Sequence, residues 1–285
     1  MSTSCATPVA RCDRSSMTAG STEIGSVRTI VAWLASLSAG RAALGRYYAT
    51  LSCGERERAA RFRCARERER YIASHGILRR IIAVRIGCAP HDPRFVPGKF
   101  GKPMLEGWTL SEPIHFNLSR SGDLMLLAIS TGGPVGADIE VISPGDIMDL
   151  AETVCSVRER EMLRALPSGL RQRYFFRLWT RKEAAVKALG AGLSISPANV
   201  DVRLPGDRKH SHRSSGAVRF RAGLPDGCDC RWGVRDISTD TGYAAAISAE
   251  GCDWYVEFRR WPGAGSAEFP LEAAEPGVSS IESGG

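Results

Sequence analysis

The sequence predicts an α+β fold. Short apolar runs bounded by turn residues are typical of strands, and longer segments with apolar residues at helical spacing indicate amphipathic helices. The order of these elements is the third observation. A helical region followed by several strands occurs twice along the 285 residues. We therefore expect two similar α/β subdomains related by pseudo-twofold symmetry, and their interface is the natural place for a binding or active site.

The first half begins with an apolar run, VRTIVAWLASL (27–37), which predicts a buried strand. The segment 67–87 places Ile72, His75 and Ile82 at helical spacing and stops at Gly87, so it predicts an amphipathic helix. Three short apolar runs follow, and the turn sequences RSGD and TGGP separate them. These runs predict an antiparallel meander of strands, IHFNLS, LMLLAIS and VGADIEVI.

The second half shows the same order of elements. Helices are expected at 157–165 and 170–189, and PSG at 167–169 separates them. Strands are then expected near 217–221, 229–237, 242–248 and 253–260. We place the subdomains at 23–143 and 144–261, after a disordered leader (1–22) and before a flexible acidic tail (262–285) that has four Glu and no Lys or Arg.

The charge is uneven. The net charge is +7, yet residues 41–94 alone carry thirteen Arg against five Asp and Glu. Such a basic field suggests a polyanionic partner, either nucleic acid, an anionic membrane or a phosphorylated small molecule. A solvated helix rich in Arg and Glu explains the same composition, so charge alone leaves both interpretations open.

Cysteine usage and hydropathy indicate a reduced, cytoplasmic protein. The nine Cys are irregularly spaced, and the CxC of Cys228 and Cys230 has no second Cys or His pair to complete a zinc site. The first residues lack the apolar run of a secretory signal, and no apolar run is long enough to cross a membrane.

Two acids close the apolar run VGADIE. Asp138 and Glu140 are two residues apart, so on a strand they share one face while Ile139 points into the core. Two carboxylates on one face repel each other unless Arg, Lys or a divalent metal lies between them, and Mg²⁺ favours a few carboxylates completed by phosphates and water. Two solvated acids at a strand end remain the alternative.

The helix FFRLWTRKEAAVKALG carries further charged residues in an apolar setting. Glu183 and Lys187 are four residues apart and share a face. Large apolar residues mark the helix as packed, so we expect Lys182, Glu183 and Lys187 to line a cleft. Earlier, FNLSRSG groups Ser119 and Arg120 at a strand end, where they could bind phosphate or complete a turn through their own side chains.

Taken together, these segments resemble a known family. A basic helix, GKP, FNLSRSG, GADIE and WTRKEAAVKALG occur in this order across most of 25–260. The chain thus resembles the Sfp-type (surfactin-type) 4′-phosphopantetheinyl transferases, which move the phosphopantetheine arm of coenzyme A to a serine of an acyl or peptidyl carrier protein. The resemblance implies adenosine 3′,5′-bisphosphate as the second product.

The resemblance also implies roles for individual residues. Asp138, Glu140 and Glu183 would hold Mg²⁺, with Mn²⁺ as the alternative, and Lys182 and Lys187 would face the phosphates. Glu183 is the candidate general base for the carrier serine, and Lys187 would neutralise or protonate the leaving phosphate. The remaining residues expected to bind coenzyme A are Arg58, Arg61 and Arg70 at the 3′-phosphate, Lys102 and Pro103 beside the adenine, and Ser119 and Arg120 near the phosphates.

One residue departs from the family pattern. Arg120 stands where the family usually has His, and Arg keeps its charge at every pH, so phosphate binding should depend less on pH near neutrality. His75 and His115 lie nearby, and a structural role is the favoured interpretation of each. The carrier, expected to be acidic, should meet residues 188–203, where Leu193 and Ile195 are either apolar contacts or core residues.

Three alternatives differ in function. A nucleic-acid-binding protein should interleave aromatic residues with its Arg, but Phe62 is the only aromatic between Arg56 and Arg70, and the three acids stay unexplained. A homologue could bind coenzyme A or a carrier without catalysis. A transferase serving fatty-acid synthesis alone is usually a short, trimeric, single-half chain, whereas two halves here imply a monomer. The carrier and its pathway, in secondary metabolism or elsewhere, stay open.

Overall fold

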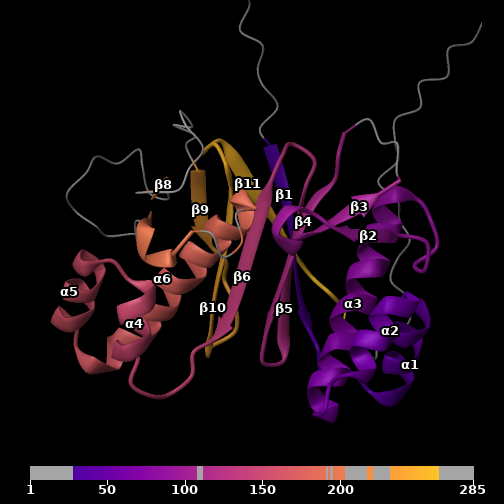
Figure 1. Cartoon of the computed structure of the whole chain (residues 1–285), viewed down its shortest axis with the longest axis horizontal. Coiled ribbons are helices and arrows are strands. Elements are labelled where there is room, and N and C mark those ends of the chain that lie inside the picture. The colour runs from indigo at the N-terminus through magenta and orange to yellow at the C-terminus, as the bar shows by residue number, and fades with distance from the viewer. Residues whose placement is uncertain are drawn as a thin grey trace, which may run out of the picture.

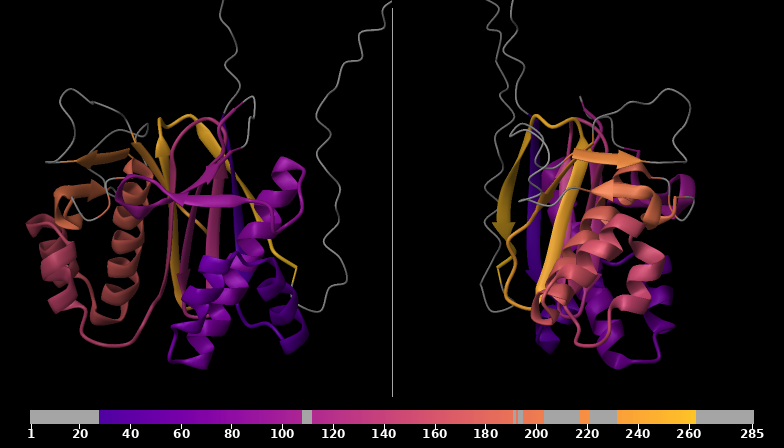
Figure 2. Two further views of the ribbon diagram at one scale, coloured as in Figure 1. Left: turned by 45° about the vertical axis from the view of Figure 1, so that its right-hand side comes forward. Right: turned by 90° about the vertical axis from the view of Figure 1, so that its left-hand side faces the viewer.

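The computed structural model describes residues 28–107, 112–190, 192, 195–202, 217–220 and 232–262. The predicted α+β class is confirmed. Two sheets lie at the centre of the molecule, with helices α1–α3 on one side and α4–α6 on the other (Figures 1 and 2). The predicted leader and nearly all of the predicted tail lie outside the described residues.

The first sheet has four strands in the order β11-β1-β5-β4. Strand β1 (Arg28–Ser36) pairs antiparallel with β5 (Leu124–Ser130), which pairs antiparallel with β4 (His115–Ser121). The last strand, β11 (Trp254–Arg260), joins β1 in parallel. The sheet thus combines residues from both ends of the described chain.

The second sheet has five strands in the order β6-β10-β9-β8-β7. Each neighbouring pair is antiparallel, and β6 is an edge strand. The bounds are β6 (Val135–Val141), β7 (Val200–Val202), β8 (Ala217–Phe220), β9 (Trp232–Asp236) and β10 (Tyr243–Glu250).

Helices α1 (Arg41–Thr50), α2 (Cys53–Ala60) and α3 (Ala65–Ile86) pack on the first sheet. Their cluster joins Ile77 and Ile82 of α3 to Trp33 of β1 and Leu127 of β5. A capping box starts α2, because the Ser52 hydroxyl accepts from the Glu55 amide and the Glu55 carboxylate accepts from the Ser52 amide. Gly87, in the left-handed conformation at φ 70°, ends α3 as predicted.

Helices α4 (Met148–Val154), α5 (Val157–Ala165) and α6 (Ser168–Leu189) cover the second sheet. The bounds of α5 are those predicted, and α6 begins two residues before its predicted start and ends at the predicted residue. Phe175 and Leu178 of α6 are buried against this sheet, and Gly190 ends the helix at φ 65°. A third apolar cluster, with Ile30 and Ile247 among its members, joins the inner faces of the two sheets.

One prediction about connectivity is wrong. Strands β4 and β5 form the expected hairpin, but β6 pairs with β10 and not with β5, so the three strands are not a meander. The subdomain boundary at residue 143 stays a prediction; both sheets draw strands from across it, because β6 lies before it and belongs to the second sheet, while β11 lies after it and belongs to the first. Strand pairing depends on contacts far apart in sequence, which local patterns do not encode.

Several elements were not predicted at all. They are α1, α2, α4, β7 and a small antiparallel hairpin of β2 (Arg94–Pro97) and β3 (Pro103–Glu106), whose turn contains the short helix η1 (Lys99–Gly101). We call residues 94–106 the connecting hairpin.

Candidate active site

The two acids of β6 share one face of the strand, as predicted. Asp138 is 1% exposed and Glu140 is partly exposed, while Ile139 is fully buried on the opposite face in the cluster between the sheets. Gly136 lies on the same face as the acids, two residues before Asp138. This face of β6 is directed at α6.

Gly136 sets how closely α6 approaches β6. A Cβ atom added to Gly136 would collide with the backbone of α6, at the Ala184 carbonyl oxygen and the Ala188 amide nitrogen. Only glycine allows this separation. The neighbouring side chains of α6, Glu183 and Lys187, are therefore held close to the carboxylates of β6.

The structure brings Lys187 directly to Asp138. The Lys187 ammonium lies 2.5 Å from Asp138 Oδ1 and donates to the Ser119 hydroxyl at 3.2 Å. The pair is unequal in exposure, with 31% of the Lys187 side chain exposed against 2% for Asp138. The ammonium therefore joins a buried carboxylate to the surface of the site, where a phosphate could reach it.

Strand β4 supplies a row of hydroxyl and amide groups to β6. The Ser119 hydroxyl donates to Asp138 Oδ1 at 2.9 Å, and the Ser121 hydroxyl donates to Glu140 Oε2 at 2.7 Å. The Asn117 side-chain oxygen accepts from the Ala137 amide at 2.8 Å. These alternate residues of β4 bridge the two sheets by side chains, so each acid of β6 is oriented by a serine of the other sheet.

The acids carry more negative charge than the lysine offsets. Burial raises the pKa of Asp138, against the attraction of Lys187. Burial and the nearby Asp138 carboxylate both raise the pKa of Glu140. Burial also raises the pKa of Glu183, and repulsion by Asp138 adds to it. A further cation would relieve this repulsion.

The donor set fits a divalent cation that also binds a substrate. Asp138 Oδ2 is buried and has no hydrogen-bond partner among the described residues, so one strong acceptor is left over. Among the described residues, no three or more Asp, Glu, His or Cys side chains are grouped so that they could hold a metal ion by themselves. Mg²⁺ typically takes one or two carboxylates and completes its shell with substrate phosphates and water, which suits these acids.

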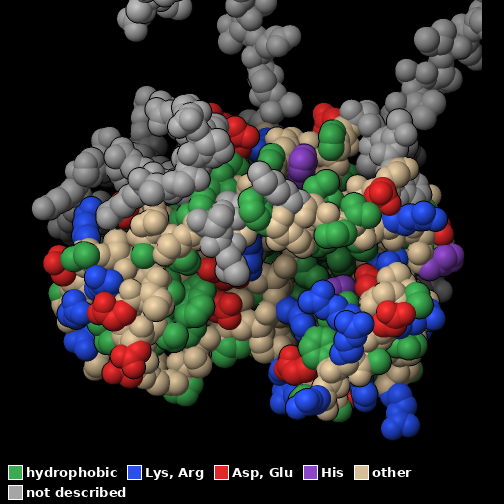
Figure 3. All heavy atoms as spheres, viewed as in Figure 1, with side chains coloured by type: hydrophobic (Ala, Val, Ile, Leu, Met, Phe, Trp, Pro, Cys, Tyr) green, Lys and Arg blue, Asp and Glu red, His purple; other side chains and the backbone are tan. Residues whose placement is uncertain are grey.

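A cleft of about 980 Å³ opens beside this cluster, between α2, α3, the connecting hairpin and β4. Three of the residues expected to bind the ligand line it: Arg58, Pro103 and Arg120. Figure 3 shows acidic side chains near the middle of this face and a group of Lys and Arg side chains to their right, across a hollow. Arg120 and Ser119 are neighbours on β4, so their side chains project to opposite sides, one toward the cleft and one toward the acids.

Arg120 is held between aromatic rings. Its guanidinium carbon lies 5.7 Å from the Phe62 ring centroid and 5.6 Å from that of Tyr71. Burial lowers the pKa of Arg120 below its usual range, which still leaves it charged near neutrality.

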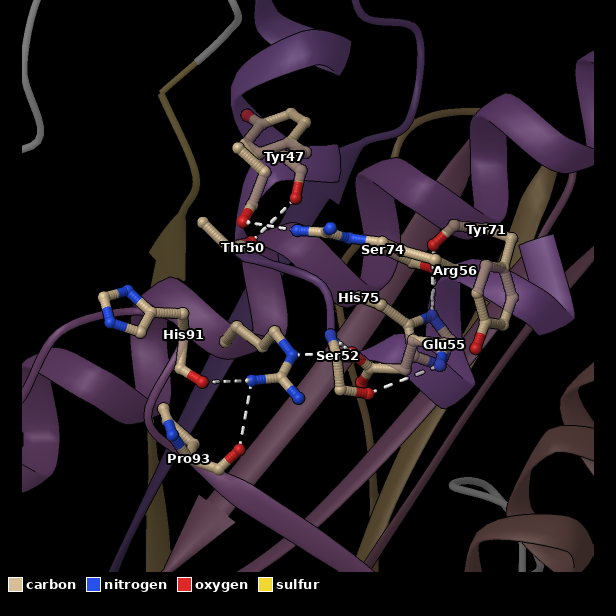
Figure 4. Close-up of polar contacts among 12 residues, drawn as sticks. Tyr47, Thr50, Ser52, Glu55, Arg56, Tyr71, Ser74, His75, His91 and Pro93 are labelled. Carbon is tan, nitrogen blue, oxygen red and sulfur yellow. Dashed lines mark hydrogen bonds and ion pairs between the residues drawn. The ribbon is translucent and has the colours of Figure 1, made fainter. Parts of the chain in front are cut away.

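The structure adds residues to the cleft that the sequence analysis missed. Arg79 is 2% exposed, donates to Glu55 at 2.7 Å, and donates to the main-chain oxygens of His91 and Pro93. Figure 4 shows these contacts at the labelled Glu55, His91 and Pro93. The ion pair thereby attaches the loop before the connecting hairpin to α2. The capping-box spacing of Ser52 and Glu55 indicates the start of α2 in the sequence, but it does not indicate the pair with Arg79.

The two histidines singled out earlier fit structural roles. The His75 ring stacks on Tyr71 at 3.9 Å between centroids, and burial lowers its pKa to about 4. Burial also lowers the pKa of His115, with smaller contributions from Lys102 and Arg28. Both imidazoles therefore favour the neutral form near pH 7.

Arg61 and Arg70 are not among the residues that line the cleft. Arg70 donates to Asp123 Oδ1 at 2.8 Å and pairs with Glu67, and these bonds raise the pKa of Arg70. Its guanidinium is therefore already occupied by carboxylates. The structure favours Arg58 over Arg70 for an anion in the cleft.

Lys182, which was expected to line a cleft with Glu183 and Lys187, lies away from the acids. Its ammonium is fully buried, pairs with Glu159 Oε2 at 2.7 Å, and donates to the main-chain oxygens of Pro197 and Val200. Lys182 and Lys187 are five residues apart and point about 140° from each other around the helix axis. Lys182 therefore holds α5 and residues 197–200 to α6 and has no path to a phosphate.

The role of Lys102 beside an adenine stays a prediction, and the structure shows where its side chain lies. Its ammonium turns away from the cleft and donates at 2.8 Å to each of two main-chain oxygens, those of Val135 and Lys187. Burial lowers the pKa of Lys102 to about 8. Pro103, its neighbour, does line the cleft.

The proposed carrier segment is described in part. Ile195 is 5% exposed and belongs to the core of the second sheet, so packing explains it. Leu193 lies outside the described residues. All five cysteines in the described part of the chain are free thiols, and no described helix is both long and apolar enough to cross a membrane.

A cleft lined by Arg58 and Arg120 on one side of β4, with buried carboxylates and an ammonium on the other side, fits a class of protein that binds a phosphate-bearing ligand together with a divalent cation. Comparison with known proteins narrows this class. The family model of the 4′-phosphopantetheinyl transferase superfamily (ACPS) matches residues 134–247, which contain the acids, Glu183 and Lys187.

Curated relatives agree over a longer span. The 4′-phosphopantetheinyl transferase HetI of Nostoc sp. (strain PCC 7120) is 32% identical over 211 residues, which cover 74% of this chain and 83% of the relative. A 4′-phosphopantetheinyl transferase of Bacillus subtilis is 31% identical over 72% of this chain and 84% of its own, and Sfp of Bacillus subtilis (strain 168) is 28% identical over the same shares. The chain belongs to the 4′-phosphopantetheinyl transferase superfamily, and the predicted enzyme class is confirmed.

Proposed function

We propose that this enzyme is of the Sfp type and transfers the phosphopantetheine arm of coenzyme A to a serine of an acyl or peptidyl carrier protein. Its similarity to Sfp and HetI over more than 70% of the chain supports the subtype. The observation that carries the proposal is the Asp138–Lys187 pair beside a basic cleft large enough for a nucleotide.

The reaction is a displacement at phosphorus. The carrier's serine oxygen forms a new bond to the phosphorus attached to the pantetheine arm, and the bond from that phosphorus to the bridging pyrophosphate oxygen breaks. The leaving group is adenosine 3′,5′-bisphosphate, and the serine proton must be removed. Such a transfer depends on positioning and on neutralising the phosphate charge.

Charge neutralisation is assigned to β6 and α6. Asp138, Glu140 and Glu183 would hold Mg²⁺, or Mn²⁺, which would neutralise the pyrophosphate when bound. Lys187, partly exposed, would donate to the leaving phosphate, while Ser119 and Ser121 orient the two acids of β6. Glu183 would accept the serine proton, a role that its raised pKa favours.

The cleft is assigned to the nucleotide. Arg58 and Arg120 would bind its phosphates, with Pro103 on the opposite wall. Arg120 and Ser119 are neighbours on β4 and face opposite sides of it. A ligand that extends across this strand would therefore reach from the cleft to the acids. A protein with this arrangement but no turnover would be the catalytically silent alternative.

The partner is proposed to be acidic and the enzyme monomeric. The Arg-rich segment 41–94 would attract an acidic carrier, so the association rate should fall steeply with salt. The site is built from β4, β6 and α6 of one chain, which suits a monomer.

Mass spectrometry of apo carrier proteins tests the function. Each carrier is incubated with the enzyme, coenzyme A and Mg²⁺, and an increase by one phosphopantetheine that EDTA abolishes is expected. Coenzyme A binding without any increase across several unrelated carriers would support the silent alternative. Absence of coenzyme A binding would contradict the proposal.

A further inference from the structure

Lys102 connects three elements that meet at the boundary of the two sheets. It follows η1 in the turn of the connecting hairpin, and its ammonium donates to Val135 at the start of β6 and to Lys187 near the end of α6, at 2.8 Å each. Both acceptors are main-chain oxygens. The contact therefore fixes backbone positions and does not depend on another side chain.

The oxygen of Lys187 is a helix-terminal acceptor. The last carbonyl groups of a helix lack intrahelical donors, and the negative end of the helix dipole favours a cation there. The Gly190 amide donates to the same oxygen at 3.2 Å. Lys102 thus completes the cap of α6 at the residue whose side chain binds Asp138.

The oxygen of Val135 lies three residues before Asp138 on β6. One ammonium consequently bridges the backbone of the strand that carries the acids and the backbone of the helix that carries the lysine. At Gly136, next to Val135, the same two elements are so close that a Cβ atom would collide with the backbone of α6.

The connecting hairpin is at the same time a wall of the cleft. Gly101 and Pro103, on either side of Lys102, both line it. Phe100 adopts φ 66°, an uncommon conformation for a non-glycine residue, and a Cβ atom added to Gly192 would lie 2.8 Å from the Phe100 Cβ. The hairpin turn therefore touches both the cleft and the segment that follows α6.

We propose that Lys102 is a positioning residue that fixes the last turn of α6, and with it the Lys187 ammonium, against Asp138 on β6. This inference rests on the proposed function, because it assigns Lys102 to the transfer step and not to nucleotide binding. It also provides a direct structural link from the cleft wall to the acids, through Gly101, Lys102 and Pro103.

Kinetics separate positioning from binding. In Lys102→Met, we expect kcat at saturating coenzyme A, Mg²⁺ and carrier to fall at least about tenfold, since small misplacements of a reacting group are costly. The Kd of coenzyme A, measured by calorimetry, should change less than about threefold. Lys102→Arg keeps a charged donor and should restore kcat to within about threefold of the wild type. Arg173→Met, which removes an exposed cation from the first half of α6, is the matched control and should behave as wild type.

Hydrogen exchange gives a readout that needs no activity. Amides at the end of α6, including that of Gly190, should exchange faster in Lys102→Met, and should not in Lys102→Arg or Arg173→Met. This measurement stands even if the wild type modifies no carrier, an outcome that would contradict only the proposed function.

Three results would overturn the inference. A large rise in the Kd of coenzyme A with kcat unchanged would make Lys102 a nucleotide ligand. Unchanged kcat and unchanged exchange in Lys102→Met would leave it no role. An Arg variant as impaired as the Met variant, while still folded by thermal melting, would show that the charged donor is not what matters.

Discussion

Lys187 and Asp138 are paired across the contact between α6 and β6, with 2.5 Å between the ammonium and Asp138 Oδ1. The other oxygen of Asp138 has no partner among the described residues, and Glu140 and Glu183 add negative charge nearby. The site therefore has more carboxylate oxygens than donors to bind them. A bound cation would coordinate Asp138 Oδ2, and a phosphate would accept from the Lys187 ammonium.

Glu183→Gln should lower turnover on the order of a hundredfold or more at saturating Mg²⁺, since the substitution removes both a metal ligand and the candidate base. The measurement is the single-turnover rate of carrier modification. Glu161→Gln, at an exposed position of α5, serves as a control. Near-normal turnover in Glu183→Gln would remove the base assignment.

Gly136→Ala should separate α6 from β6, because the new methyl group would meet backbone atoms of Ala184 and Ala188 that cannot rotate away. We expect a lower melting temperature and a loss of activity larger than the loss of folded protein accounts for. Gly169→Ala changes the same helix where a Cβ atom meets nothing within 4 Å, and it should be stable and active. Equal behaviour of the two variants would contradict the close-approach argument.

The raised pKa values of Glu140 and Glu183 predict opposite pH effects with and without metal. A carboxyl group whose pKa is higher in the folded state binds more protons there, so without metal its contribution to stability improves as pH falls through the raised pKa. Mg²⁺ needs the ionised form, so its stabilising effect should grow as pH rises.

Thermal melting checks these opposite pH effects. The wild type and Glu140→Gln are compared at pH 5 and pH 8, with and without Mg²⁺. The variant should be more stable than the wild type at the higher pH without Mg²⁺, and less stabilised by Mg²⁺. Identical pH and Mg²⁺ responses in the two proteins would rule the prediction out. Comparing the pair removes the contributions of other groups, including Asp123 and Asp236, whose pKa values are lowered by their Arg partners despite burial.

Arg120 predicts a KM for coenzyme A that has no histidine-like dependence on pH. Its guanidinium stays charged, and His75 in the same cleft is neutral across this range because burial lowers its pKa to about 4. In Arg120→His, the KM for coenzyme A should change with pH, with a midpoint at about pH 6.5, the ordinary pKa of His. A wild-type KM that already changes sharply near that pH would count against Arg120 as the phosphate ligand.

Much of the site could be predicted because it depends on local geometry. Alternation along a strand places Asp138 and Glu140 on one face, and a spacing of four residues places Glu183 and Lys187 on another. The same helical geometry places Lys182 about 140° from Lys187 around the helix axis, so the sequence alone argues against both lysines reaching the same phosphate. The ends of α3 and α6 were predictable because Gly87 and Gly190 occupy left-handed positions.

The rest depends on contacts between distant residues. The pairing of β6 with β10, and of β1 with β11, joins segments roughly one hundred and two hundred residues apart, which no local pattern specifies. The connecting hairpin was missed because its Pro and Gly residues are typical of a loop. The role of Lys102 follows only from where that hairpin lies against α6.

The single-turnover rate of Asp138→Asn tests most directly whether this cluster performs the transfer. The substitution keeps the shape of a buried side chain and removes its charge, and coenzyme A should still bind in the cleft. At saturating coenzyme A and Mg²⁺, we predict a loss on the order of a thousandfold, since buried charges at a transfer centre contribute strongly. A rate within about tenfold of the wild type would place the chemistry elsewhere.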